Sequence, residues 1–313
     1  MYNLESIMES IFQSIVAAIE QKQPFALAII SGVKGSSPQK KGAKALFFAD
    51  GRIHGTLGGG CLEAEVRERA RLALLKQKPA TFDLVLDHDF GWDDGLICGG
   101  KVFGLILPQA AQAEGIWREL AQREKTVTWG VNQEFAIDWA TDSSKWLYRE
   151  TVSPPCVLWI AGSGHVARAV APLALQLDFA VTLFDDRPSL ANHQYFPQAT
   201  QLRVDAWEKL LSEPLPPQPT FGLIVTRGHQ HDALVLRSWV HRPFAFLGMI
   251  GSRRKRRLIF SQFVEQKIAT AEQLERVACP VGVDIQAVSV PEIAVSVMGQ
   301  LIQQRAHIAA PKT

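Results

Sequence analysis

The chain has 313 residues, of which 47% are hydrophobic and 20% charged, a composition that is typical of packed globular domains and excludes a disordered chain. The net charge of +2 is too small to attract a polyanion by bulk electrostatics, so we expect no nucleic-acid partner. No apolar stretch approaches the roughly 20 residues that a membrane-spanning helix needs, and no secretory leader is recognisable at the N-terminus, so we expect a cytoplasmic protein with no membrane contact.

The first half of the chain predicts a mixed α+β domain. Apolar residues at three- and four-residue intervals predict a helix over residues 4–18. Residues 61–76 also have helical character, and weaker signals predict a helix at 116–123. A loop is expected at residues 32–41 and a hairpin turn at Asp50-Gly51. Strands are expected at residues 25–30, 43–48, 52–56, 81–86, 102–107, 126–131 and 146–149.

The sequence Ser153-Pro154-Pro155 predicts a domain boundary, because adjacent prolines stiffen the chain and start neither a helix nor a central strand. We therefore place an N-terminal α+β domain at residues 1–152 and a second domain at 153–313. In the second domain, strand-like segments at 157–161, 180–184, 221–226 and 244–249 alternate with helix-like ones. This alternation predicts an α/β, Rossmann-type domain with a mainly parallel sheet. Ser289 and Glu292 predict a capping box at the start of the last helix.

A glycine-rich turn follows the first strand of that domain. Residues 162–167 read Gly-Ser-Gly-His-Val-Ala, and Asp185 and Asp186 end the next strand about 20 residues later, as in dinucleotide-binding turns. Gly162 permits the tight turn, Gly164 lets the backbone approach a phosphate, and the helix start offers amides to an anion. The two aspartates could hold a ribose hydroxyl. The alternative is a Rossmann fold that has kept the turn without the nucleotide.

Other polar residues suggest further anion contacts. Gly251-Ser252 ends another strand and is followed by five basic residues, 253–257, which spread around a helix and cannot form one flat nucleic-acid face. Of these, Arg253 and Arg254 lie nearest the helix start and could assist an anion. Lys40, Lys41 and Lys44 could contact a phosphate or be ordinary surface lysines. His229 and His231 lie where open α/β sheets bind ligands, but we predict no metal ligands from them.

The motif Gly58-Gly59-Gly60-Cys61 places a thiol at a predicted helix start, with three glycines clearing its approach. A helix N-terminus lowers the pKa of a thiol, and a thiolate there could bind a soft metal, accept sulfur as a persulfide or attack an electrophile. The alternative is a buried structural cysteine. Cys98, followed by two glycines, has a similarly open setting, whereas Cys156 and Cys279 are expected in the core. The four cysteines form no CxxC pair, which argues against a zinc knuckle and a disulfide framework.

Several strings, in this order, resemble the xanthine dehydrogenase accessory protein family of the XdhC/CoxI type. The first half contains GSSP at 35–38, GAK at 42–44, GTLGGGCLE at 55–63 and CGG at 98–100. The second half contains GSGHVA at 162–167, DDRP at 185–188, IGSRRK at 250–255 and PVGVDI at 280–285. The resemblance spans nearly the whole chain, and only the stretch at residues 109–150 has no family motif. The string TRGHQHD at 226–232 departs from a more compact family pattern, so the resemblance implies no role for His229 or His231.

The resemblance implies a maturation factor for molybdenum hydroxylases. Such a chaperone binds molybdenum cofactor, as molybdopterin or its dinucleotide form, while a cysteine desulfurase installs the terminal sulfur, and then passes it to an apoenzyme such as xanthine dehydrogenase. It need not turn over a substrate, and a homodimer is one assembly to test. The Rossmann turn alone would equally suit an NAD(P)-dependent oxidoreductase, which is the alternative. The reactive residues would be Cys61 and Cys98, and the cofactor-binding residues would be Gly58, Gly59, Gly60, Gly162, Ser163, Gly164, His165, Asp185, Asp186, Gly251, Ser252 and Arg253.

Overall fold

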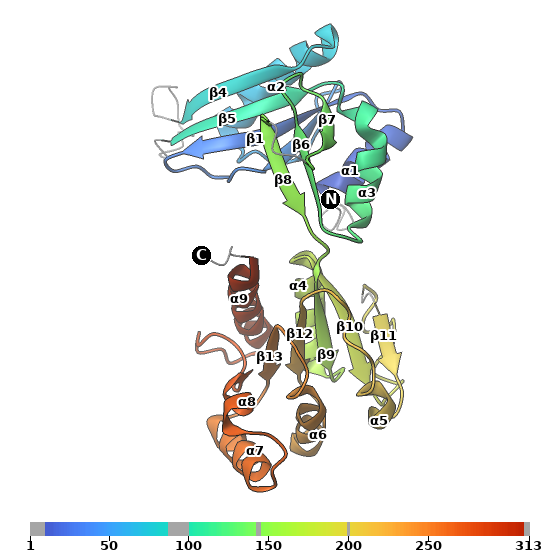
Figure 1. The fold of residues 1–313 in the computed structure, drawn as a ribbon, viewed down its shortest axis with the longest axis vertical. Helices are drawn as coiled ribbons and strands as arrows, with labels where there is room; N and C mark the ends of the chain where they lie inside the picture. Colours follow the sequence, from blue (N-terminus) through green and yellow to red (C-terminus); the bar gives the residue numbers. More distant parts are fainter. Residues whose placement is uncertain (1–9, 87–99, 142–144, 199–200, 310–313) are drawn as a thin grey trace. The chain divides into compact units, whose positions relative to one another are not determined.

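The computed structural model describes residues 10–86, 100–141, 145–198 and 201–309 (Figure 1). Its contacts divide the chain into two compact units, Met1–Pro154 and Pro155–Thr313. The first unit is α+β and the second contains a six-stranded parallel sheet flanked by helices, which confirms the predicted fold class.

The N-terminal unit is built on an antiparallel five-stranded sheet in the order β3-β2-β1-β5-β4. The strands are β1 (Phe25–Lys34), β2 (Lys44–Phe48), β3 (Ile53–Gly55), β4 (Ala80–Leu86) and β5 (Gly100–Leu107). A smaller sheet in the order β7-β6-β8 contains β6 (Val127–Val131), β7 (Ile137–Trp139) and β8 (Tyr148–Val152). The helices are α1 (Ile11–Glu20), α2 (Gly60–Lys76), α3 (Glu114–Gln122) and the short 3₁₀ helix η2 (Ala110–Ala113).

Strand β1 is buried on both faces, which explains its continuous apolar run. Phe25, Leu27 and Ile29 face a core formed with α1, α3 and the smaller sheet, whereas the residues between them face the core under α2. The strand continues to Lys34, although a loop was expected from residue 32, because Gly32 resumes pairing with Phe103 of β5 after a register shift. Cross-strand pairing thus overrides the loop-like composition.

The C-terminal unit has its parallel sheet in the order β11-β10-β9-β12-β13-β14. The strands are β9 (Cys156–Ala161), β10 (Phe179–Asp185), β11 (Gln201–Val204), β12 (Thr220–Ile224), β13 (Phe246–Met249) and β14 (Val277–Ala278). The helices are α4 (His165–Gln176), α5 (Trp207–Leu210), α6 (His229–Trp239), α7 (Arg253–Glu265), α8 (Ala271–Glu275) and α9 (Val290–Ala309). Elements β7, β11, β14, α5 and α8 were not predicted, since each is too short to show a periodic pattern.

Both faces of this sheet are covered. On β9, Leu158 and Ile160 pack in a core with α4 and α9, whereas Trp159 packs with side chains from α5, α6, α7 and α8. The predicted capping box of α9 is confirmed: Ser289 donates its amide to Glu292 Oε2 at 2.8 Å, and the Glu292 amide donates to Ser289 Oγ at 3.4 Å. The carboxyl ends of the strands therefore form an edge between two fixed layers of helices.

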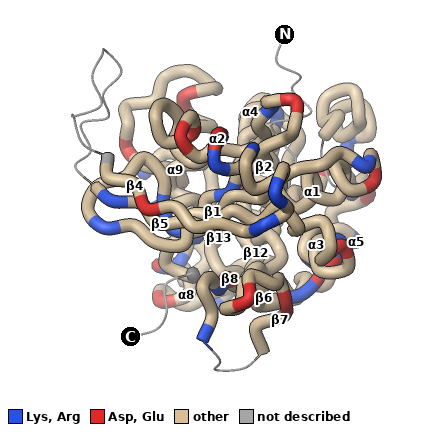
Figure 2. Tube along the Cα trace, turned by 90° about the horizontal axis from the view of Figure 1, so that it is seen from above, with Lys and Arg blue, Asp and Glu red and all other residues tan. Residues whose placement is uncertain are grey.

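Charged residues of both signs are interspersed along the trace (Figure 2). Among the residues that the structure describes, no helix has both the length and the apolar composition needed to cross a bilayer.

Candidate functional site

The glycine loop before α2 is held by one carboxylate. Glu63 Oε1 accepts hydrogen bonds from the Thr56 hydroxyl (2.7 Å) and from the amides of Leu57 (2.9 Å) and Gly59 (3.0 Å). Burial alone would raise the pKa of Glu63, but these hydrogen bonds outweigh burial and lower it. Glu63 was not among the predicted site residues, although a carboxylate in the first turn of a helix is well placed to accept hydrogen bonds from loop amides.

Cys61 is the second residue of α2 and its side chain is exposed. The preceding Gly59 caps the helix with no side-chain hydrogen bond, and a Cβ added to it would have no heavy atom within 4 Å. The thiol is therefore open to solvent, which excludes the buried structural alternative. Cys98 lies outside the described residues. Cys156 is half-buried and Cys279 is buried, and burial raises the pKa of the Cys279 thiol.

Lys44 fits neither expectation for it, because its side chain is only 5% exposed and its Nζ lies 2.7 Å from Glu150 Oε2. The same Nζ donates to the Gly42 carbonyl at 2.8 Å and lies 5.5 to 5.7 Å from the ring centroids of Phe12, Trp129 and Tyr148. Burial lowers the pKa of Lys44, and Glu150 opposes that shift. Lys44 thus joins β2 to β8 inside the core, whereas Lys40 and Lys41 are exposed.

We expect Lys44→Met to lose about 3 kcal/mol, because methionine keeps most of the packing but leaves the Glu150 carboxylate without its cationic partner. Lys44→Ala should lose roughly 2 kcal/mol more, through the cavity that the missing side chain leaves. Urea denaturation of the full chain measures both. If the two variants lose the same stability, the contribution of Lys44 comes from its ion pair with Glu150 and not from the packing of its aliphatic side chain.

In the C-terminal unit, the predicted turn leaves β9 at Gly162, whose φ of 111° and close approach to the Val225 carbonyl both require glycine. Ser163 is fully buried. Gly164 caps α4 without a side-chain hydrogen bond, and a Cβ added there would meet no heavy atom within 4 Å. His165, the first residue of α4, is exposed. The backbone at Gly164 therefore borders open space.

The carboxylate of Asp185 accepts hydrogen bonds from donors within the protein. Its Oδ2 accepts from the Ser163 amide (2.8 Å), the Ser163 hydroxyl (2.7 Å) and Arg187 Nη2 (2.8 Å), and its Oδ1 accepts from the Arg187 amide (3.0 Å) and Nε (2.8 Å). Burial alone would raise the pKa of Asp185, but these hydrogen bonds lower it to about 2. The side chain is 1% exposed, so it has no lone pair left for a ribose hydroxyl.

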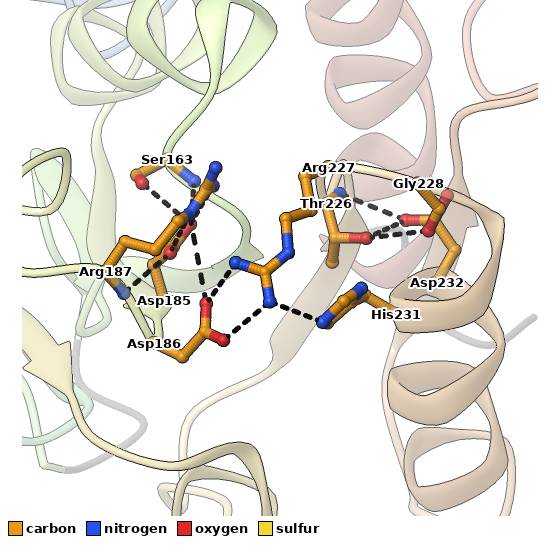
Figure 3. Close-up of polar contacts among 9 residues, drawn as sticks. All are labelled: Ser163, Asp185, Asp186, Arg187, Thr226, Arg227, Gly228, His231 and Asp232. Atoms are coloured by element: carbon orange, nitrogen blue, oxygen red, sulfur yellow. Dashed lines mark hydrogen bonds and ion pairs between the residues drawn. The ribbon is translucent and has the colours of Figure 1, made fainter.

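Asp186 is the more accessible carboxylate, with its side chain 23% exposed. Arg227, which follows β12, donates to Asp186 through Nη1 (3.3 Å) and Nη2 (2.9 Å), as Figure 3 shows. The same Nη2 lies 2.7 Å from His231 Nε2, and because arginine can only donate, this nitrogen of His231 is the acceptor. Arg227 was not among the predicted site residues, because its partner Asp186 lies 41 residues away along the chain.

The side chain of Lys255 covers the second glycine turn, at Gly251-Ser252. Lys255 forms an ion pair with the buried Asp232 and donates to the Ile250 carbonyl at 3.0 Å. A Cβ added to Gly251 would lie 2.8 Å from Lys255 Cδ. Ser252 Oγ accepts the Lys255 amide at 3.2 Å and so caps α7. Arg253 and His229 are exposed at the first positions of α7 and α6.

The structure thus brings together Ser163, Asp185 and Asp186 from the predicted set, and adds Arg187 and Arg227 to them (Figure 3). Gly58, Gly59, Gly60 and Cys61 form a separate group in the N-terminal unit. Two sets of groups with distinct chemistry result: an exposed thiol beside a glycine loop, and a glycine turn flanked by paired charges.

Comparison with known proteins adds two family models. The model described as the XdhC and CoxI family matches residues 18–85, and the model described as the XdhC Rossmann domain matches residues 158–301. The first match includes the glycine loop with Cys61, and the second includes the turn at Gly162 together with Asp186 and Arg227.

Similar proteins cover most of the chain. An Escherichia coli protein named uncharacterized protein YqeB is 30% identical over 94% of the chain, which spans only 46% of that relative's length. A Bacillus subtilis protein, named as a probable subunit of xanthine dehydrogenase, is 26% identical over 94% of the chain and 97% of its own length. A crystal structure described as a xanthine dehydrogenase from Bacillus halodurans is 25% identical, with a TM-score of 0.82 over 97% of this chain and 98% of that one.

Proposed function

Because the chain belongs to the XdhC and CoxI family, we propose that it is an accessory protein that matures a molybdenum hydroxylase. In this proposal it binds molybdenum cofactor, holds it while a cysteine desulfurase supplies the terminal sulfur, and delivers it to the apoenzyme. The observation that carries the proposal is that models of both parts of the family match the two units in order, at residues 18–85 and 158–301. Two similar proteins have xanthine dehydrogenase in their names, which makes that enzyme the first client to test.

The residues present fit such a cofactor in two respects. The open space beside Gly164 and the uncapped first turn of α4 suit a phosphate group, since backbone amides at a helix start bind anions. The exposed thiol of Cys61 suits sulfur chemistry or a soft metal. When bound, the cofactor would supply the redox-active molybdenum that the client enzyme needs.

Each group then has a defined task. The turn at Gly162 and Gly164 binds the phosphate end of the cofactor, and Asp186 serves a ribose where the cofactor is a dinucleotide. Cys61 either carries the sulfur or contacts the metal, and Glu63 fixes the loop from which the thiol projects. Gly59 keeps the approach to that thiol open.

The test is to purify the full chain from cells that make molybdenum cofactor, oxidise a denatured sample and measure the fluorescent pterin. We expect pterin with the wild type and a loss of about tenfold or more in retention, or in client activation, for Cys61→Ser, whose fold should be unchanged because the side chain is exposed. Cys156→Ser is the matched control, since it removes a thiol from the start of β9 and should retain the pterin.

The absence of pterin from the wild type, both as purified and after loading in vitro, would overturn the proposal. A Cys61→Ser protein that activates its client normally would remove Cys61 from it while leaving cofactor binding intact. Titration with NADH and NADPH checks the alternative, because saturable binding with turnover of a carbonyl substrate would instead identify an oxidoreductase.

A further inference from the structure

In the C-terminal unit, a salt bridge links the ends of β10 and β12, the two strands that flank β9. Asp186 directly follows β10 and Arg227 follows β12, and β9 lies between these strands in the sheet. The bridge therefore passes the carboxyl end of β9, where the turn at Gly162 begins. In open α/β sheets this is the point at which the strand order reverses and ligands bind. Arg227 thus occupies part of the space that a ligand would enter.

The charges at this edge are arranged in two pairs of unequal strength. Asp185 and Arg187 form the buried pair, with the carboxylate 1% exposed and held by Ser163 as well. Asp186 and Arg227 form the outer pair, with side chains 23% and 40% exposed. Ion pairs this exposed contribute little to stability. Breaking the outer pair so that its members bind other groups therefore requires little free energy, whereas breaking the inner pair requires much more.

The four charges cancel, so an incoming anion meets no net attraction from them while both pairs are formed. If Arg227 turns to a phosphate, Asp186 loses its bidentate partner. Arg187 Nε lies 3.8 Å from Asp186 Oδ1, which is beyond hydrogen-bonding distance. The carboxylate then needs new donors, and the hydroxyl groups of a ribose attached to the same phosphate supply them.

We propose that Arg227 is an exchange arm, which pairs with Asp186 in the free protein and moves to the ligand's phosphate on binding, so that Asp186 accepts the ribose hydroxyls. The inference rests on the proposed function and names the ligand class of its Rossmann turn: a nucleoside diphosphate group, such as the nucleotide end of a dinucleotide cofactor. Simple phosphates are disfavoured because they leave Asp186 without a partner.

The experiment is isothermal titration of the full chain with three probes: ADP, 2′,3′-dideoxy-ADP and inorganic pyrophosphate. We expect the wild type to bind ADP about tenfold more tightly than the dideoxy compound, the size expected for a hydrogen bond to a charged group. Asp186→Asn should bind pyrophosphate severalfold more tightly, because Arg227 is released, and should lose most of the preference for the hydroxyl groups. Arg227→Gln should bind pyrophosphate about tenfold more weakly and keep that preference.

The opposite signs of the two effects on pyrophosphate exclude a structural role, which would weaken binding in both variants alike. Loss of the preference for the ribose hydroxyls in Asp186→Asn distinguishes exchange from a mere change in net charge, which would leave that preference unaltered. Arg118→Gln is the matched control, because Arg118 is 46% exposed and also has two partners, Glu20 and Glu114, but lies in the N-terminal unit. It should bind every probe as the wild type does. Binding of ADP that neither Asp186→Asn nor Arg227→Gln alters would overturn the exchange arm alone. A wild type that binds no probe would instead overturn the nucleotide site of the proposed function.

Discussion

Gly162→Ala should destabilise the C-terminal unit by about 3 to 5 kcal/mol, through backbone strain and a steric clash. The φ of 111° at Gly162 is strained for any L side chain, which costs about 1 to 3 kcal/mol. In addition, a Cβ would lie 2.4 Å from the Val225 carbonyl oxygen, so the loop after β12 would have to move. For a unit of this size such a loss corresponds to a melting temperature roughly 10 °C lower, which calorimetry of the full chain can resolve.

The control for this prediction is Gly164→Ala, two residues further along the same turn. Gly164 has an ordinary φ of −74° and open space where the methyl group would lie. We expect a change below about 1 kcal/mol, mainly from the altered helix cap. A Gly162→Ala protein that melts with the wild type would show that the turn after β9 is not closely packed against β12.

Asp185→Asn should be the second strongly destabilising change, by about 3 kcal/mol. The substitution removes the charge that Arg187 neutralises and turns an amide donor toward Ser163, whose amide and hydroxyl both need an acceptor. Urea denaturation of the full chain measures the loss. The neighbouring Asp186→Asn is the control and should lose at most about 1 kcal/mol, since its pair with Arg227 is partly solvated.

The pH dependence of the stability difference between the wild type and Asp185→Asn tests whether the lost charge causes that difference. The pKa of Asp185 is lowered to about 2 in the folded protein, from about 4 when unfolded. A lowered carboxyl pKa gives stability that is fully present above the unfolded value and is lost as the pH falls toward the folded one. The wild type should therefore exceed Asp185→Asn in stability at pH 6, with the gap narrowing between about pH 4 and pH 2. A gap that stays constant over this range would mean that packing, not charge, explains the loss.

Local patterns predicted most of the fold. The strand β9, the turn at Gly162 and the capping box at Ser289 each depend on residues close together in the sequence, and the structure has all three. Short elements such as β7 and α8 escaped prediction because three to five residues carry no period. The extension of β1 to Lys34 was missed because it depends on pairing with β5, some 70 residues away.

The polar contacts of the candidate site were harder to predict, because they join residues that are distant in the chain. The position of Asp185 was expected, but its saturation by Ser163 and Arg187 depends on how two strand ends meet. Lys44 reads as a surface lysine beside a loop, yet Glu150 and three aromatic rings enclose it. Charge alone gives no sign of such burial, since lysines are almost never fully buried unless paired.

The exposure of Cys61 also determines how the assembly of this protein should be measured. Because the thiol is exposed, two copies can be linked by a disulfide when air oxidises the protein, with oxygen accepting the two hydrogen atoms. A band of doubled mass on a gel without reductant would then reflect oxidation during storage rather than a native dimer. Sedimentation with a phosphine reductant present, repeated on Cys61→Ser, separates this artefact from a true homodimer.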